Sequence, residues 1–139
     1  MGVGFNITGI RTEQFAIFPE HLNIHQEAQV SHSFQFMSNP QLQQVGVFAA
    51  FDFKQQSRIV MRITVSCHFG IGISAWHNFV NGNTLCLPLD FAINLSVITA
   101  STARGILASK TEHTPFANYI LPLLDIKNII TDDVVFQLY

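Results

Sequence analysis

The alternation of apolar and polar residues is clearest in two neighbouring segments, residues 45–53 and 59–69. In the second segment every odd position from Ile59 to Phe69 is apolar, while Arg62, Thr64 and His68 occupy even positions. Because successive side chains of a strand point to opposite faces of a sheet, each segment has one buried and one wetter face. Residues 54–57 form a short polar connection, so the pair predicts an antiparallel hairpin.

Two earlier segments show related patterns. Residues 28–36 alternate in the same way, which predicts another strand with a buried and a wetter face. Residues 5–18 favour a strand with an irregularity, because Arg11 and Glu13 interrupt its apolar face, and Pro19 ends it. Residues 20–27 are polar and form a connection. The first half of the chain therefore predicts four antiparallel strands.

The second half changes to helical spacing. Residues 74–80 predict a short helical turn and residues 81–83 a tight turn. Pro88 and Asp90 are typical of a helix start, and the main helix is expected from about residue 89 to 109. Its interior is rich in Ser and Thr, which are poor helix formers, so burial must stabilise it. After Thr114-Pro115 we expect a second short helix or an extended tail. The apolar positions at helical spacing are Phe91, Leu95, Ile98 and Ile106.

Strands first and helices afterwards indicate the α+β class. We expect one domain over residues 1–139, with a four-stranded antiparallel sheet and two C-terminal helices packed on one face. Apolar residues make up 48% of the chain and charged residues only 12%, about half the usual share. We therefore expect a homo-oligomer or a partner to cover apolar surface. The alternative is a well-packed monomer whose surface carries Gln, Asn, Ser and Thr.

Charge and hydropathy exclude several classes of partner. The net charge is −2 and the basic residues are scattered, so nucleic-acid binding is not expected. No uninterrupted apolar run reaches the roughly 20 residues of a membrane span, so we expect no membrane insertion. The N-terminus lacks a basic region followed by an apolar block, which favours a cytoplasmic location. In that location Cys67 and Cys86 are expected to be two reduced thiols.

Catalytic and metal chemistry find little support. His21 and His25 are four residues apart, but no third ligand follows at a suitable spacing and Pro19 disfavours a helix there. There is no Gly-x-Ser-x-Gly motif and no Gly-rich phosphate loop. The pair Asp132-Asp133 is interpreted as a solvated turn. We expect neither an enzyme nor a cofactor.

Three short motifs resemble the SecB-type protein-export chaperone family. Gly70-Ile71 follows Phe69 at the end of the fourth strand, where that family has a Gly-Ile-Phe element. Ala103-Arg104 matches the end of the family's helix signature, and Leu121-Pro122 matches its Leu-Pro pair. We expect Arg104 to face a carboxylate or helix-end carbonyls, the alternative being a solvated arginine. We expect Leu121-Pro122 to fix an extended tail against the sheet edge. Val65 stands where the family has an acid that engages the motor SecA, so the export role transfers less well than the fold.

The resemblance implies an oligomeric chaperone or peptide-binding module. It would hold unfolded or extended polypeptide in an apolar groove between sheet and helix, by hydrophobic burial and backbone pairing. The alternative is a partner-specific adaptor or structural protein on the same fold, such as a dedicated chaperone or an antitoxin-like component with one client. The alternative for each groove candidate is a position in the core or at a subunit interface. The candidates are the apolar residues outside the cleanest core pattern: Phe48, Trp76, Phe79, Phe116 and Tyr119.

Overall fold

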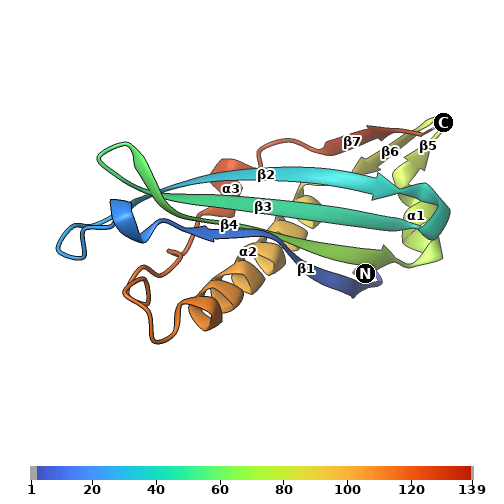
Figure 1. Ribbon diagram of the computed structural model, residues 1–139. Coiled ribbons are helices and arrows are strands. Elements are labelled where there is room, and N and C mark those ends of the chain that lie inside the picture. The colour runs from blue at the N-terminus through green and yellow to red at the C-terminus, as the bar shows by residue number, and fades with distance from the viewer. Residues whose placement is uncertain (1–2, 139) are drawn as a thin grey trace.

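The fold is built on a four-stranded antiparallel sheet in the order β1-β4-β3-β2 (Figure 1). The computed structural model describes residues 3–138. The expected hairpin is confirmed, although its strands are longer than predicted, because only Gln56 and Ser57 remain in the turn. Both have positive φ angles, 51° and 67°, as in the turns that match the twist of a hairpin. The strands are β1 (Phe5–Ile17), β2 (Gln29–Asn39), β3 (Gln44–Gln55) and β4 (Arg58–Ile71).

The irregularity expected in β1 is confirmed as two shifts of register against β4. They lie between Ile7 and Gly9 and between Thr12 and Gln14. Each shift leaves one extra residue in β1, as in a β-bulge, and a bulge re-aims the side chains around it. The second shift frees Glu13, whose carboxylate accepts a hydrogen bond from Ser66 on β4 at 3.1 Å. A polar residue that interrupted the sequence pattern therefore has a specific partner.

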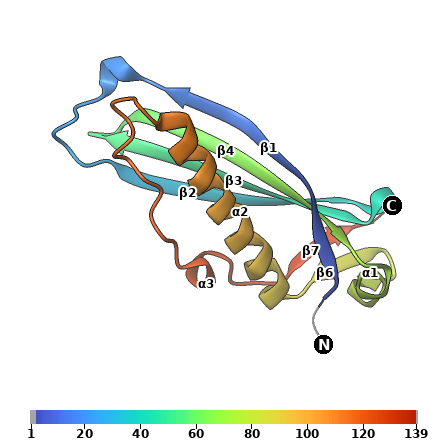
Figure 2. The same ribbon diagram turned by 90° about the horizontal axis from the view of Figure 1, so that it is seen from below.

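One face of the sheet carries the helices. The long helix α2 (Leu89–Thr111) crosses this face, and α1 (Ile73–Phe79) and α3 (Ile126–Ile129) lie on the same side (Figure 2). The odd-numbered residues of β3 and β4 point toward α2 and form the core, as the alternation predicts. The predicted α+β architecture is thus observed. The short helix expected after the main helix is α3, which has only four residues. Core residues between the sheet and α2 include Ala49, Phe51, Phe53, Met61, Ile63, Val65, Ala103 and Leu107.

A second sheet was not expected from the sequence. It contains β5 (Val80–Asn81), β6 (Thr84–Leu87) and β7 (Val134–Gln137), in the order β5-β6-β7. Strands of two to four residues are too short for an alternating pattern to stand out. This sheet brings Leu85 and Leu87 against a second core cluster that contains Trp76 and Phe91.

The helix α2 starts at Leu89 as expected and ends two residues beyond the predicted end. The backbone N–H of Leu89 donates to the carboxylate of Asp133 at 2.8 Å. Asp133 is exposed, as the solvated-turn interpretation implies, yet it also places a negative charge at the helix N-terminus, which is stabilising. Within the helix, the hydroxyls of Ser96 and Thr99 donate to the carbonyls four residues earlier. These bonds satisfy buried polar side chains.

By length and composition α2 is also long and apolar enough to cross a membrane, with a mean hydropathy of 1.3 over its best window. The core helix of a water-soluble protein passes the same test. Here α2 packs on the sheet through Leu95, Ala100, Ala103 and Leu107, all at most 3% exposed. Both cysteines are free thiols, Cys67 buried and Cys86 partly buried.

Candidate functional site

The candidate site is a groove of about 380 Å³ between the start of β2 and the segment that follows α2. Ile24 and Ile120 stand on its two sides and are 63% and 65% exposed. Its lining is mainly apolar, and Glu27 is the carboxylate among the lining residues. The lining consists of Ile24, Gln26, Glu27, Ala28, Val30, Phe53, Pro115, Asn118, Tyr119, Ile120 and Pro122. We refer to this site as the groove.

The side chain of Gln55 holds the two sides of the groove together. It is only 5% exposed, at the end of β3, although the sequence placed it in a polar connection. Its Oε1 accepts from the backbone N–H of Asn23 at 2.9 Å. Its Nε2 lies 2.9 Å from the carbonyl of Asn23, 3.0 Å from that of Gln26 and 3.1 Å from the hydroxyl of Tyr119. One amide thus joins the hairpin, residues 23–26 and Tyr119.

The hydroxyl of Tyr119 completes this network. It lies 2.9 Å from the carbonyl of Gln26 and 3.1 Å from that of Asn23. A phenol has one proton to donate, so it bonds one carbonyl at a time, and the Gln55 amide serves the other. The ring of Tyr119 remains available as part of the groove lining. The polar end of this residue therefore fixes position, and its aromatic ring offers contact area.

Arg104 fixes the segment on the far side of the groove. Its Nε donates to the carbonyl of Leu121 at 2.9 Å and its Nη2 to that of Pro122 at 3.0 Å. Arg104 was expected to face a carboxylate or helix-end carbonyls; its partners are instead backbone carbonyls of an extended segment. Leu121 was expected along a sheet edge. It is instead 1% exposed and packs in the core beneath α2. Pro122 then reaches the groove wall.

The groove opens beside an edge of the sheet. β2 is the last strand in the order β1-β4-β3-β2, and among residues 3–138 no strand pairs with its outer edge. Ala28, just before this strand, and Val30, its second residue, line the groove. A free strand edge presents backbone N–H and C=O groups that can pair with an added extended segment. Apolar lining and unpaired backbone thus lie side by side.

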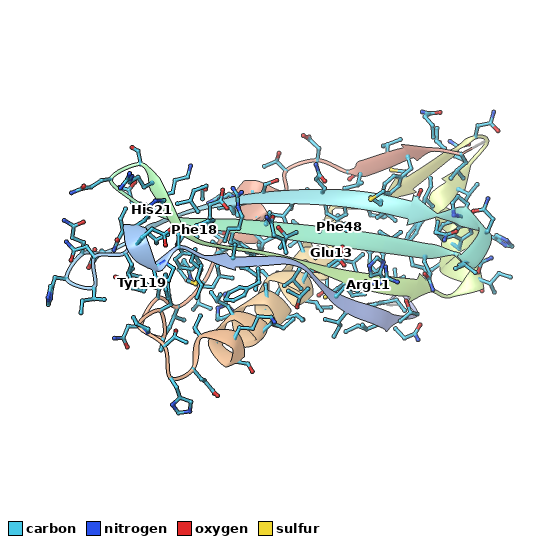
Figure 3. The ribbon with its side chains drawn as sticks, in the orientation of Figure 1. Arg11, Glu13, Phe18, His21, Phe48 and Tyr119 are labelled. Carbon is cyan, nitrogen blue, oxygen red and sulfur yellow. The ribbon has the colours of Figure 1, made fainter. Side chains whose placement is uncertain are left out.

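The five residues expected to form a peptide groove do not converge. Tyr119 lines the groove, but Trp76 and Phe116 are only 5% and 1% exposed and belong to the core. Phe79 packs against Phe91, with ring centroids 5.5 Å apart. Phe48 lies on the opposite face of the sheet, 5.8 Å from the ring of His68. Figure 3 shows Tyr119 near one end of the molecule and Phe48 on the strands, away from it.

These five residues were grouped wrongly because the local sequence pattern does not reveal which other parts of the chain cover a segment. Phe116 follows a tight turn in which Thr114 accepts its backbone N–H at 3.1 Å, and this turn directs the ring inward. Sequence reasoning missed Ile24 and Ile120, the two most exposed apolar residues of the groove. Ile24 lies in an expected polar connection, and Ile120 lies in the apolar stretch just before Pro122. Neither segment has a clear period that would show which of its apolar residues stays exposed.

His21, near this end of the molecule, makes local structural contacts. The ring of His21 stacks on Phe18 with centroids 5.9 Å apart, and its Nδ1 lies 3.3 Å from the carbonyl of Ile59. Within the described residues, no three His, Cys, Asp or Glu side chains come together as metal ligands would. The groove offers apolar contact and backbone hydrogen bonds.

The fold and the groove define an α+β domain with an antiparallel sheet that carries its helices on one face. No family model and no curated protein matches this chain. A solved structure of a protein of unknown function from Streptococcus agalactiae is similar, with a TM-score of 0.42 and 13% identity. The similarity covers 81% of this chain and 90% of that chain.

Proposed function

We propose that this protein is a SecB-like, oligomeric chaperone or peptide-binding module that holds unfolded or extended polypeptide in the groove. One observation carries the proposal: the apolar groove opens directly beside the unpaired edge of β2. An extended segment placed there pairs its backbone with β2 and inserts an apolar side chain between Val30 and Tyr119. Neither step needs a cofactor or a covalent reaction.

Binding at a single groove is expected to be weak. Full burial of one large apolar side chain contributes about 1.5–3 kcal/mol. Association also requires an extended chain to become ordered, which opposes binding. A chaperone with several grooves therefore binds one long client more tightly than a single groove does, because each contact after the first is intramolecular. This reasoning supports the expected homo-oligomer, and light scattering at micromolar concentration tests it: a monomer mass contradicts the oligomer.

The groove is tested by suppression of aggregation of a chemically denatured model protein at stoichiometric ratio. Ile120→Ser removes an exposed apolar side chain from the groove, and Ile73→Ser is its matched control. The two isoleucines are 65% and 61% exposed, but Ile73 lies at the start of α1, away from the groove. We expect Ile120→Ser to lower suppression several-fold and Ile73→Ser to leave it unchanged. Equal activity of both variants, or no suppression by the unmodified protein, contradicts the proposal.

The adaptor alternative predicts a different binding pattern. A chaperone of broad use captures many unfolded clients, whereas a dedicated adaptor captures one folded or unfolded partner in a fixed ratio. Quantitative pull-down with the unmodified protein and Ile120→Ser separates the two. A broad set of clients lost together in the variant supports the chaperone, and a single stoichiometric partner supports the adaptor.

A further inference from the structure

The face of the sheet opposite α2 has a hollow of about 360 Å³. Residues from all four strands line it, with Arg11 from β1, His68 from β4, Phe48 from β3 and Met37 from β2. Arg11, Glu13 and Phe48 lie on these strands in Figure 3. We call this site the open-face hollow. The remaining lining residues are Ser38, Asn39, Leu42, Gln44 and Gly46.

Glycines create the open-face hollow. His68 is paired with Gly9 on β1 and Gly46 on β3, so neither of its directly paired residues has a side chain. A Cβ built on Gly46 would lie 3.2 Å from His68 Nδ1 and 3.2 Å from the Phe48 ring. That spacing is tighter than ordinary van der Waals contact. The absence of a side chain at Gly46 thus leaves room for the imidazole and for the hollow beside it.

A buried hydroxyl orients His68. Ser66 is fully buried, and its Oγ lies 3.1 Å from Glu13 Oε1 and 3.0 Å from His68 Nε2. An ionised carboxylate only accepts, so Ser66 donates to Glu13 and accepts from an N–H at Nε2 of His68. The other ring nitrogen, Nδ1, lies toward Gly46 in the hollow and has no hydrogen-bond partner among the described residues. Because Ser66 is buried, this trio does not offer a nucleophile.

Arg11 supplies a second free group. Over residues 3–138 the one salt bridge is that of Arg62 with Asp52, so the guanidinium of Arg11 is not paired with a carboxylate. The charged groups around His68 are Arg11 and Glu13, both from β1. The neighbours from β3 and β2 are Gly46, Phe48 and Met37, which carry no charge.

We propose that the open-face hollow binds a small organic carboxylate with an aromatic or aliphatic body. Arg11 donates to the carboxylate, as guanidinium groups do in strong charge-assisted pairs. His68 presents Nδ1 to the same hollow, and its hydrogen bond with Ser66, which donates to Glu13, holds the ring in place. Phe48, Met37 and Leu42 contact the apolar body; Met37 and Leu42 are 58% and 62% exposed. The volume lies in the range of small-molecule sites.

The experiment uses phenylacetate as the probe and phenylacetamide as its uncharged match, titrated into ¹⁵N-labelled full-length protein. We expect saturable shifts of the amide signals of Gly46 and His68 and of the His68 ring nitrogens with phenylacetate. Phenylacetamide should bind at least tenfold more weakly, because it cannot form the charge-assisted hydrogen bonds with Arg11.

Arg11→Gln is the test variant, and Arg58→Gln, an exposed arginine at the start of β4, is its control. Arg11→Gln should weaken phenylacetate binding about tenfold or more, and Arg58→Gln should not. Equal binding of acid and amide, an unchanged affinity in Arg11→Gln, or no saturable shift at millimolar probe overturns the proposal. Ile120→Ser should bind phenylacetate normally, so a failure here and a failure of the peptide groove are distinguishable.

Discussion

The hydrogen-bond network of Gln55 provides the sharpest test of how the groove is held. Gln55→Leu keeps a side chain of similar size but removes the amide that joins Asn23, Gln26 and Tyr119. A glutamine amide has two protons to donate, so at most two of the three contacts of Nε2 are satisfied at once. Two bonds donated by Nε2 and one accepted by Oε1 give the Gln55 side chain at most three hydrogen bonds at a time.

The expected loss follows from these three bonds. A typical intramolecular hydrogen bond contributes about 1 kcal/mol net, and a buried group left unsatisfied costs more. Asn23 and Gln26 are exposed, so water can bond some of the backbone groups that lose the Gln55 amide in the leucine variant. We expect Gln55→Leu to lower the free energy of unfolding by about 2–3 kcal/mol. For a chain of this length that corresponds to a fall in Tm of roughly 10 °C.

The assay is urea unfolding followed by the fluorescence of Trp76, the one tryptophan of the chain. Its indole is buried in the second core cluster, away from Gln55, so it reports unfolding of the whole domain. Gln35→Leu, on the exposed side of β2, is the control. A loss below about 0.5 kcal/mol, or an equal loss in the control, refutes the reasoning. In a double-mutant cycle with Tyr119→Phe, we expect a coupling of about 0.5–1 kcal/mol through the bond between the two side chains.

Three further predictions concern the same half of the fold and the helix N-terminus. Phe116→Ala should destabilise the domain by about 3–5 kcal/mol in urea unfolding, as expected of a core residue; a change under 1 kcal/mol contradicts its burial. Arg104→Met should cost about 1–2 kcal/mol and expose the segment after α2 to limited proteolysis, an effect that Arg58→Met should not produce. Burial, followed by the charge of Asp133, raises the pKa of the Cys86 thiol. The folded chain thus retains this proton to higher pH than the unfolded chain. At pH 8, alkylation of Cys86 should therefore be slower in the folded protein than in the urea-unfolded protein. It should be faster in folded Asp133→Asn than in the folded unmodified protein. Equal rates contradict this.

The sequence by itself determined the main elements, because backbone geometry sets their periods. The alternation in residues 28–36, 45–53 and 59–69 identified β2, β3 and β4 and the face of each that is buried. Helical spacing and the start signal at Pro88 and Asp90 located α2. The strand that contains Arg11 and Glu13 was expected to be irregular, and it is. Each of these inferences depends on neighbours within a few residues, which the sequence displays directly.

Tertiary structure alone decided which side chains meet. Gln55 lay in an expected polar connection, yet it is buried because residues 23–26 and Tyr119 fold over it. Ile24 and Ile120 are distant in sequence and face one groove only because β2 and the segment after α2 are packed together.

The same limit applies to the opposite face and to the helix N-terminus. The alternation showed that His68 lies on the wetter face, but the strand register decided that Gly9 and Gly46 flank it. Likewise, Asp133 reaches the N-terminus of α2 because β7, which follows Asp133, pairs with β6, the strand that directly precedes α2. Local pattern fixes the backbone and the buried face, whereas partners distant in the chain depend on register and packing, which no short segment contains.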